Sequence, residues 1–239
     1  MKEKAFETED PTMMALIRAI ACEDADQAVE LIDAHPQLAT RRVHMGATRA
    51  DAKSYFFEQI SHYVYAGDTV LHVAAAAHND DIAGRLLKNG ADVGAKNRRG
   101  AEPLHYASDS RSVVSLRKPQ AQTDTISLLI AFGANPNAVD MDGVAPLHRA
   151  VRTRSIDAVR ALLDGGADFR RKNKNGSSAL HLAVQNTGRG GSSAPEAKAH
   201  QKNIIELLLQ FGASIEDKDF QGKTVKECIR EEWIKKLVL

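Results

Sequence analysis

The sequence has few aromatic residues, two cysteines and no long hydrophobic run. Aromatic residues make up 5% of the 239 positions, so Ala, Leu, Ile and Val supply most of the apolar surface, which suits closely stacked helices. Cys22 and Cys228 have no metal-type spacing, so we expect no zinc site. No apolar run approaches the roughly 18 residues of a membrane span, and residues 1–12 lack the apolar core of a signal peptide. We therefore expect a cytoplasmic protein in a reducing setting.

The sequence also lacks a large net charge. Its formal net charge is +1, which gives no overall field that would attract nucleic acid. Aromatic and basic residues do not alternate in a way that predicts a nucleic-acid surface. The charge is unevenly distributed, however, because residues 1–35 carry a net −6 and residues 144–176 a net +5. We expect an acidic N-terminal end and a basic region in the second half.

The motifs of common catalytic sites are absent. The chain has no G-x-S-x-G and no G-x-x-x-x-G-K. The T-G-R-G-G-S-S segment at 187–193 neither follows a strand nor opens a helix directly, so its composition predicts a flexible loop. We therefore expect no enzyme activity, no cofactor and no metal ion.

A repeated pattern is present instead. The segment A-P-L-H-R-A at 145–150 returns as T-V-L-H-V-A at 69–74, E-P-L-H-Y-A at 102–107 and S-A-L-H-L-A at 178–183. Each copy is entered after a glycine, and the spacings between successive entry glycines are 33, 43, 33 and 46 residues. A period of about 33 therefore holds, with insertions in two copies. The entry glycines are Gly67, Gly100, Gly143, Gly176 and, in a last partial copy, Gly222.

This period and the T-P-L-H-x-A pattern resemble the ankyrin repeat. The resemblance covers residues 13–36 and 67–239, and its basic segments are also similar to a group of compact bacterial ankyrin proteins. It implies an all-α solenoid of stacked helix–turn–helix units with projecting β-hairpin turns. Leu147, Leu162 and Leu180 should then lie in one continuous interior across adjacent units.

The predicted organisation follows from this register. Residues 1–11 are expected to be disordered, with Thr12 as the N-cap of a capping helix pair over 12–36. An atypical insertion occupies 37–66, and a capping half-repeat occupies 223–239. The repeats over 67–222 are predicted at 67–99, 100–142 with an insertion at 108–123, 143–175, and 176–221 with an insertion at 186–202; we call them repeats one to four.

The atypical insertion carries most of the aromatic residues. We expect residues 54–65 to form a strand or extended hairpin, or alternatively a short helix. The cluster predicts either a local mini-core or, with the nearby basic residues, an interaction surface. The aromatic residues are Tyr55, Phe56, Phe57, Tyr63 and Tyr65, and the basic ones are Arg41, Arg42, Arg49 and Lys53.

The histidines follow the repeat. The resemblance implies that His72, His105, His148 and His181 bond backbone groups at the start of each inner helix, and that Thr69 bonds its own histidine. Glu227 takes the histidine position in the last half-repeat. The other histidines have no ligand spacing, so we expect a structural role for the repeated ones rather than metal binding or acid–base chemistry.

The resemblance implies a non-enzymatic module that binds a protein partner on a concave surface of hairpin tips and inner helices. The basic tips predict an acidic patch on the partner, and we expect a monomer that binds neither nucleic acid nor membrane. Tyrosine and arginine anchor interfaces more often than their abundance suggests. The expected contact residues are Arg98, Arg99, Tyr106, Met141, Asp142, Arg149, Arg152, Lys172, Lys174, Asn175 and Phe220.

An alternative function uses the two insertions. Both insertions leave the same edge of the solenoid, on either side of the helix–helix turn in repeat three. Basic residues from the two insertions and from this turn could therefore form a recess for a phosphate or another small anion. A small-anion sensor or a hydrolase would fit such a recess. The opposing interpretation is that the loops are solvated and the arginines pair with Asp109, Asp157 or Glu196. The recess residues would be Arg111, Arg117, Lys118, Arg152, Arg154 and Arg189.

Overall fold

The computed structural model describes residues 10–110, 118–185 and 195–238. The chain divides into two compact units. Unit 1 comprises residues 1–107 and 113–135, and unit 2 comprises residues 108–112 and 136–239. Each unit is a two-layer stack of short helices, in agreement with the predicted all-α solenoid.

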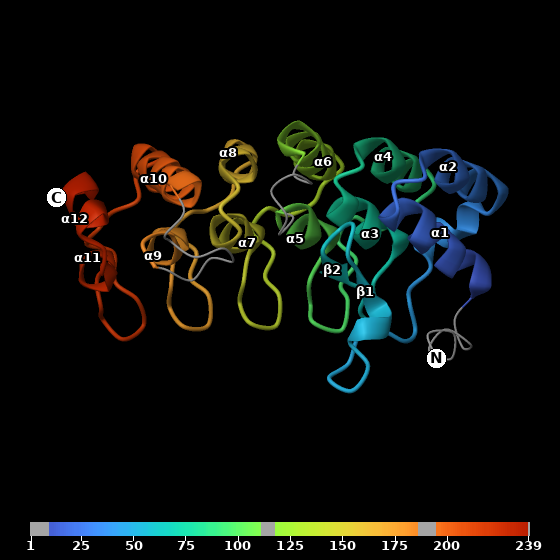
Figure 1. Ribbon diagram of the computed structural model, residues 1–239, viewed down its shortest axis with the longest axis horizontal. Helices are drawn as coiled ribbons and strands as arrows, with labels where there is room; N and C mark the ends of the chain where they lie inside the picture. Colours follow the sequence, from blue (N-terminus) through green and yellow to red (C-terminus); the bar gives the residue numbers. More distant parts are fainter. Residues whose placement is uncertain (1–9, 111–117, 186–194, 239) are drawn as a thin grey trace. The chain divides into compact units, whose positions relative to one another are not determined.

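Unit 1 pairs an inner and an outer layer. Figure 1 shows α2, α4 and α6 side by side in one layer and α1, α3 and α5 in the other. The unit also contains two 3-10 helices, η2 and η3, and two short strands. The elements are α1 (Pro11–Ala21), α2 (Ala25–Ala34), η2 (Pro36–Thr40), η3 (Lys53–Tyr55), β1 (Phe56–Phe57), β2 (His62–Tyr63), α3 (Val70–Ala77), α4 (Asp80–Lys88), α5 (Pro103–Ala107) and α6 (Pro119–Ala131).

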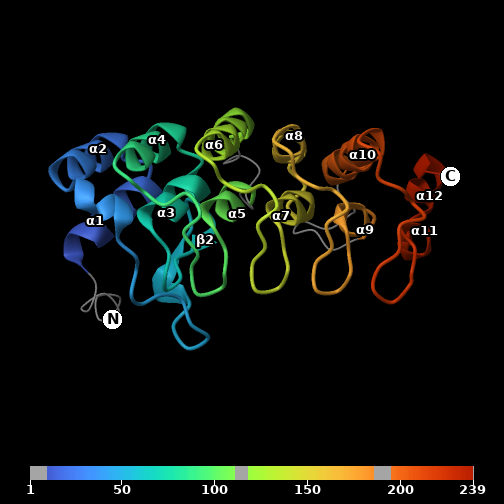
Figure 2. The same cartoon turned by 180° about the vertical axis from the view of Figure 1, so that it is seen from behind.

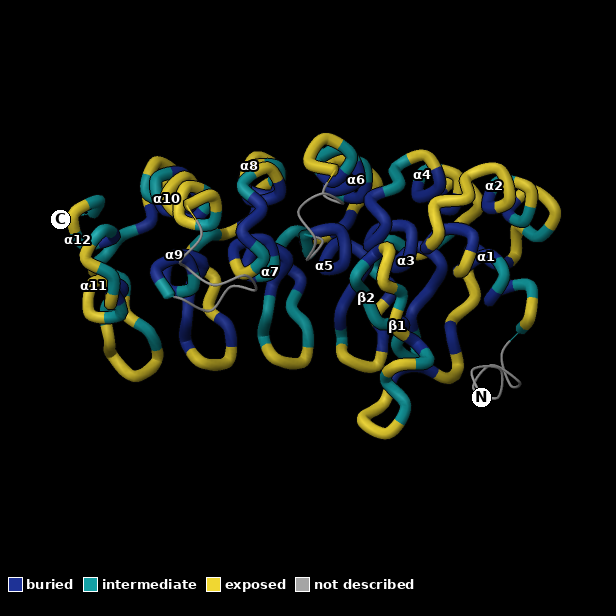
Figure 3. The backbone as a smooth tube through the Cα atoms, in the orientation of Figure 1, coloured by how far each residue is buried: buried dark blue, intermediate teal, exposed yellow. Residues whose placement is uncertain are grey.

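Unit 2 repeats the same plan. Its inner layer is α7, α9 and α11, and α8 and α10 lie over it, while Figure 2 shows the hairpin loops leaving the inner layer on the side away from the outer helices. Figure 3 shows buried residues between the layers and exposed residues on the outer helices and hairpin ends. The elements are α7 (Pro146–Arg152), α8 (Ile156–Asp164), α9 (Ala179–Ala183), α10 (Pro195–Gln210), α11 (Val225–Cys228) and α12 (Glu232–Val238).

The apolar interior of unit 2 is continuous across neighbouring repeats. Leu147 on α7, Leu162 on α8 and Leu180 on α9 are all at most 2% exposed. Helix α7 packs against both α8 and α9. This confirms the packing expected of stacked repeats, in which each unit buries its apolar face against the next.

The first helix begins earlier than predicted. The carboxylate of Asp10 accepts hydrogen bonds from the backbone N–H groups of Thr12 at 2.9 Å and Met13 at 3.4 Å, so Asp10 is the N-cap of α1. The prediction that Thr12 is the cap is therefore wrong. Pro11 takes the first helical position, where its missing N–H has no cost, and an acidic side chain before it supplies the better acceptor.

The atypical segment contains both of the predicted alternatives. Strands β1 and β2 pair antiparallel, with Phe56 opposite Tyr63, and the 3-10 helix η3 precedes them. Tyr55, Ile60 and Val64 are buried beneath this hairpin. Of the predicted aromatic cluster Tyr55 is buried, whereas Phe56, Phe57, Tyr63 and Tyr65 are exposed or partly exposed, so the mini-core prediction holds only for Tyr55.

Repeats without an insertion turn sharply between their helices. His78 after α3 and Arg154 after α7 adopt left-handed backbone conformations, with φ of 53° and 56°. Asn79 and Ser155 follow them and cap α4 and α8. The left-handed residue ends one helix and lets the next start within two residues.

The two repeats with insertions lack this short turn, and in each of them a glutamine side chain of the outer helix bonds the end of the inner helix. The Gln122 side-chain amide donates to the carbonyl oxygen of Ala107 at 2.9 Å, and that of Gln201 donates to Ala183 at 2.8 Å. Each bond satisfies a carbonyl at the end of an inner helix that the longer connection would leave without a partner. Helices α6 and α10 begin at Pro119 and Pro195, earlier than predicted. Residues 111–117 and 186–194 of the two insertions lie outside the described residues.

Candidate partner-binding surface

The hairpins of unit 2 share one turn chemistry. In each, an Asp or Asn side-chain oxygen accepts from the backbone N–H groups two and four residues further on, at 2.8–3.1 Å. A glycine with positive φ follows in each hairpin. The acceptors are Asp140, Asn173 and Asp219, and an Asp or Asn side chain that bonds its own backbone is a common way to fix a tight turn. The residues between acceptor and glycine are therefore held at the tip.

Neighbouring tips of unit 2 are in contact. The backbone N–H of Lys174 donates to the carbonyl oxygen of Asp142 at 3.2 Å. A Cβ atom added at Gly176 would lie 2.7 Å from Cγ of Phe220, so that ring packs directly on the glycine. The tips that contain Asp142, Lys174 and Phe220 thus form one continuous surface.

Two exposed apolar side chains lie on this surface. Phe220 is 68% exposed and Met141 is 64% exposed, the highest values for large hydrophobic side chains among the described residues. The Lys172 ammonium lies 5.6 Å from the centroid of the Phe220 ring, within cation–π range. Lys174 and Asn175, on the hairpin between those of Met141 and Phe220, are also exposed. We name Met141, Lys172, Lys174 and Phe220 the tip surface.

Arg149 is a predicted contact residue whose guanidinium is already paired. It donates to the carboxylates of Asp109 at 3.0 Å and Asp140 at 3.1 Å, and its side chain is 16% exposed. Asp140 is also the acceptor that closes a hairpin. Arg149 therefore fixes that hairpin to its inner helix, which corrects the prediction that it is an exposed contact.

Tyr106 is not a surface residue either. Its side chain is 2% exposed, and its hydroxyl donates to the Asp68 carboxylate at 2.9 Å. The Asn97 amide also donates to Asp68, at 2.8 Å, and so does the backbone N–H of Tyr65, at 2.7 Å. Asp68 is fully buried, so these donors replace its lost hydration. Tyr106 thus belongs to a buried network of unit 1 and not to a partner surface.

The sequence contained a weak signal for this network. In the other three copies of the pattern, the position of Tyr106 holds Val73, Arg149 or Leu182. A lone tyrosine on a helix that is otherwise buried needs a hydrogen-bond partner for its hydroxyl. That partner is 38 residues away in the sequence, which is why sequence reasoning missed it.

The predicted anion recess is only partly within the described residues. Arg111, Arg117 and Arg189 lie outside them. Lys118 belongs to unit 1, where its ammonium pairs with Glu23 at 2.6 Å. The start of the first insertion does lie against the turn of repeat three, as expected, because the N–H of Ser110 donates to Thr153 Oγ1 at 3.1 Å.

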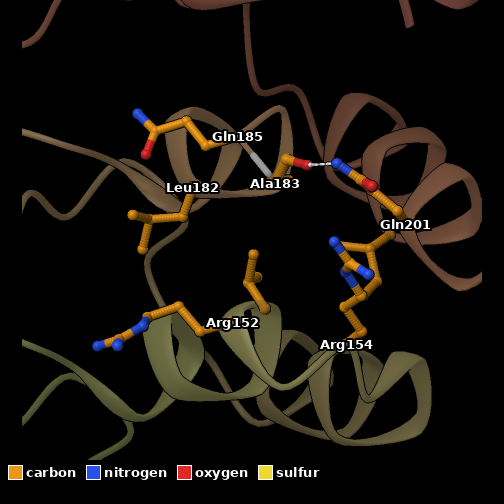
Figure 4. Close-up of a pocket in the computed structure, with 8 residues that line it drawn as sticks. Arg152, Arg154, Leu182, Ala183, Gln185 and Gln201 are labelled. Atoms are coloured by element: carbon orange, nitrogen blue, oxygen red, sulfur yellow. Dashed lines mark hydrogen bonds between the residues drawn. The ribbon is translucent and has the colours of Figure 1, made fainter. Parts of the chain in front are cut away.

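The remaining two recess residues line a small pocket in unit 2. Figure 4 shows Arg154 pointing toward Gln201, whereas the guanidinium of Arg152 points away from it. The pocket encloses about 240 Å³ including its open mouth. Burial lowers the pKa of the Arg154 guanidinium from its usual value. The two arginines therefore diverge, and they do not form the predicted fork for one anion.

The four repeated histidines are structural. Nδ1 of His72, His148 and His181 accepts from the backbone N–H three residues earlier, and Nε2 bonds a carbonyl of the following hairpin at 2.9–3.4 Å. Nδ1 of His105 accepts in the same way from Glu102 at 3.1 Å. Because Nδ1 is the acceptor, the ring proton lies on Nε2 and the neutral form fits both bonds. Burial lowers the pKa of His72, His148 and His181.

Two other expectations concern metals and membranes. Across residues 10–110, 118–185 and 195–238, no three His, Cys, Asp or Glu side chains are grouped to bind a metal ion. Within the same ranges, no helix has the length and apolar character that crossing a membrane requires.

Comparison with known families agrees with this architecture. A model of ankyrin repeats in three copies matches residues 117–219, and a model of ankyrin repeats in many copies matches residues 71–118. The matches run without a gap over more than half of the chain. The chain belongs to the ankyrin repeat family. Members of this family are generally protein–protein interaction modules and are typically non-enzymatic. No curated protein matches the sequence.

Proposed function

We propose that this ankyrin protein binds a protein partner through the tip surface of unit 2. The observation that carries the proposal is the exposure of Phe220 and Met141 on hairpin tips that touch one another. Large exposed apolar side chains on a rigid scaffold supply the buried centre of an interface, where most of the binding energy concentrates.

The charge of unit 2 indicates the chemistry of the partner. Unit 2 holds 18 basic and 14 acidic residues, and Lys172 and Lys174 lie next to Phe220 in the tip surface. A positive charge beside the apolar ring of Phe220 favours an acidic patch on the partner at that point, which speeds association and fixes its orientation. A monomeric binding module that carries no cofactor is consistent with this arrangement.

Reversing the charge of the tips tests the proposal. The variant Lys172→Glu/Lys174→Glu, together with Phe220→Ser, should lose a partner that the wild-type chain captures. The matched control is Lys198→Glu/Lys202→Glu on outer helix α10, which makes the same charge change on exposed residues away from the tips. Quantitative mass spectrometry of captured, cross-linked proteins should show at least one protein reduced about tenfold by the tip variant and retained by the control. Equal retention by both variants would refute the tip surface as the binding site.

A further inference from the structure

A second surface lies on unit 1 and is built by the atypical segment. Phe56 and Tyr63 are paired across β1 and β2, and their ring centroids are 4.7 Å apart. Tyr65 follows two residues after Tyr63, on the same face of the chain, with a ring centroid 6.2 Å from that of Tyr63. The guanidinium carbons of Arg98 and Arg99 lie 5.5 Å and 5.4 Å from the Tyr65 centroid. We name these five residues the aromatic–arginine ledge.

The ledge is connected to the buried network of Asp68, Asn97 and Tyr106. The ring of His62, which alternates with Tyr63 along β2, stacks on Tyr106 at 4.1 Å between centroids. Tyr106 in turn bonds Asp68. The backbone at Tyr65 is fixed by the same network, because the N–H of Tyr65 donates to the Asp68 carboxylate.

The arginine hairpin is attached to the same segment. The N–H of Arg98 donates to the carbonyl of Ala66 at 2.9 Å, and its guanidinium donates to the carbonyl of Ala47. The ledge is therefore ordered before any ligand arrives. A preformed surface loses little conformational entropy on binding, which favours affinity.

The side chains of the ledge offer two kinds of contact. Phe56 is 36% exposed, and Tyr63 and Tyr65 are partly exposed, so three neighbouring rings, tilted by 47° and 42° to one another, offer apolar surface to a ligand. An arginine stacked on an aromatic face keeps the N–H groups at the edge of its guanidinium plane, and these donate well to carboxylates. The ledge thus combines apolar contact with carboxylate recognition over a short distance.

The basic charge around the ledge indicates what kind of ligand it would bind. Residues 41–65 and 96–99 contain seven basic and two acidic residues, whereas the rest of unit 1 contains seven basic and fifteen acidic ones. A long polyanion such as a nucleic-acid strand would meet the acidic remainder of the unit. A short acidic peptide fits the basic region without that repulsion.

We propose that the aromatic–arginine ledge binds a short acidic peptide segment of a protein, one that places an aromatic or aliphatic side chain next to Asp or Glu. The apolar side chain lies against Phe56 and Tyr63, and the carboxylate meets the edges of Arg98 and Arg99. The ledge lies in unit 1 and shares no residue with the tip surface of unit 2.

Peptide selection against the full chain tests the ledge. A phage-displayed library of random peptides of about 12 residues is selected on the wild-type chain and counter-selected on Phe56→Ser/Arg99→Glu. The matched control is Phe132→Ser/Lys88→Glu, which makes the same two chemical changes on exposed residues of the same unit. Circular dichroism and thermal melting establish that each variant remains folded, and Tyr63→Ala provides a second ledge variant.

The expected result is a set of peptides in which Asp or Glu adjoins an aromatic or aliphatic residue. A fluorescent copy should bind the wild type and the control equally in anisotropy titrations, and should lose at least about tenfold in affinity with either ledge variant. It should bind the tip variant Lys172→Glu/Lys174→Glu/Phe220→Ser as it binds the wild type, which separates this proposal from the proposed function.

Two outcomes would refute the proposal that the ledge binds an acidic peptide. One is that no peptide is enriched on the wild type over the ledge variant, or that the enriched peptides lack acidic residues. The other is that a labelled oligothymidine of about 12 nucleotides binds the ledge more tightly than the selected peptide does, which would assign the surface to single-stranded nucleic acid.

Discussion

The hairpins that begin at Asn97 in unit 1 and at Asn173 in unit 2 have the same turn chemistry and different surroundings. Each asparagine oxygen accepts from the N–H groups two and four residues ahead. The Asn97 amide nitrogen also donates to Asp68 at 2.8 Å and to the Tyr106 hydroxyl at 2.9 Å. The same local turn therefore closes a buried polar network in unit 1 and supports an exposed hairpin tip, part of the proposed binding surface, in unit 2.

The position after the repeated histidine shows the same division. In two of the four copies this position holds a polar side chain: Tyr106 in unit 1, which is buried and bonds Asp68, and Arg149 in unit 2, which pairs with Asp109 and Asp140. The other two copies hold the apolar Val73 and Leu182. Both polar side chains link an inner helix to a hairpin. The comparison indicates that a repeat keeps its backbone while the polar partner of this position changes with its neighbours.

The largest expected effect comes from replacing the two asparagines. Asn97→Asp places a second carboxylate beside the buried Asp68 and removes a donor from it, so we expect a loss of about 3 kcal/mol or more in the free energy of unfolding. Asn173→Asp should change stability by less than about 0.5 kcal/mol, because Asp140 and Asp219 already form the same turn. Urea unfolding followed by circular dichroism measures both, and similar losses in the two variants would contradict the comparison.

A smaller effect is expected from removing one hydroxyl. Tyr106→Phe keeps the ring that stacks on His62 but takes one donor from the Asp68 carboxylate, which should cost about 1–3 kcal/mol. The affinity of the ledge for its peptide should fall as well, because Tyr106 positions His62 and with it strand β2 of the ledge. For the stability measurement alone, Tyr63→Phe is the control, because it removes a tyrosine hydroxyl from a partly exposed side chain outside this network. A Tyr106→Phe variant as stable as the wild type would mean that Asp68 does not need this hydroxyl.

The smallest expected effect per residue is the pH dependence of the repeated histidines. Burial lowers the pKa of His72, His148 and His181 below the usual value near 6.5, so below that pH the unfolded chain binds more protons than the folded one. Stability should be fully present above about pH 6.5 and fall as the pH drops toward the folded pKa values, by at most about 1.4 kcal/mol per pH unit for each histidine. Both units should lose hydrogen-exchange protection in acid. Unchanged protection from pH 7 to 5 would show that these histidines are not buried in the neutral form.

Local patterns predicted the repeats because their bonds are short in sequence. The histidine at the helix start bonds a backbone N–H three residues away, and the Asp or Asn turn bonds groups two to four residues away. The helix pairs, the hairpins and the capping role of Glu227, which bonds Thr224, follow from such spacings. The beginnings of α6 and α10 were predicted too late, because the glutamines that stabilise them act through carbonyls 15 and 18 residues away.

The candidate sites could be predicted only in part. The hairpin tips follow from the position of each turn, so the exposed position of Met141, Lys172, Lys174 and Phe220 could be predicted from the sequence, while their contact with a partner stays a prediction. Tyr106 and Arg149 were assigned to the surface because their partners are 38 and 40 residues away. The aromatic cluster was seen, but not that Phe56, Tyr63 and Tyr65 share one face with Arg98 and Arg99.

The sequence by itself determined the repeat period, the alternation of helix pairs and hairpins, and the structural role of the histidines, since each depends on contacts within one repeat or between adjacent ones. Only the tertiary structure decided which polar side chains are exposed. Tyr106 and Arg149, which were expected to be exposed contact residues, instead link an inner helix to distant carboxylates. That distance depends on how segments far apart in the sequence, such as those that contain Asp68 and Asp109, pack against the inner helices, which no regular spacing encodes.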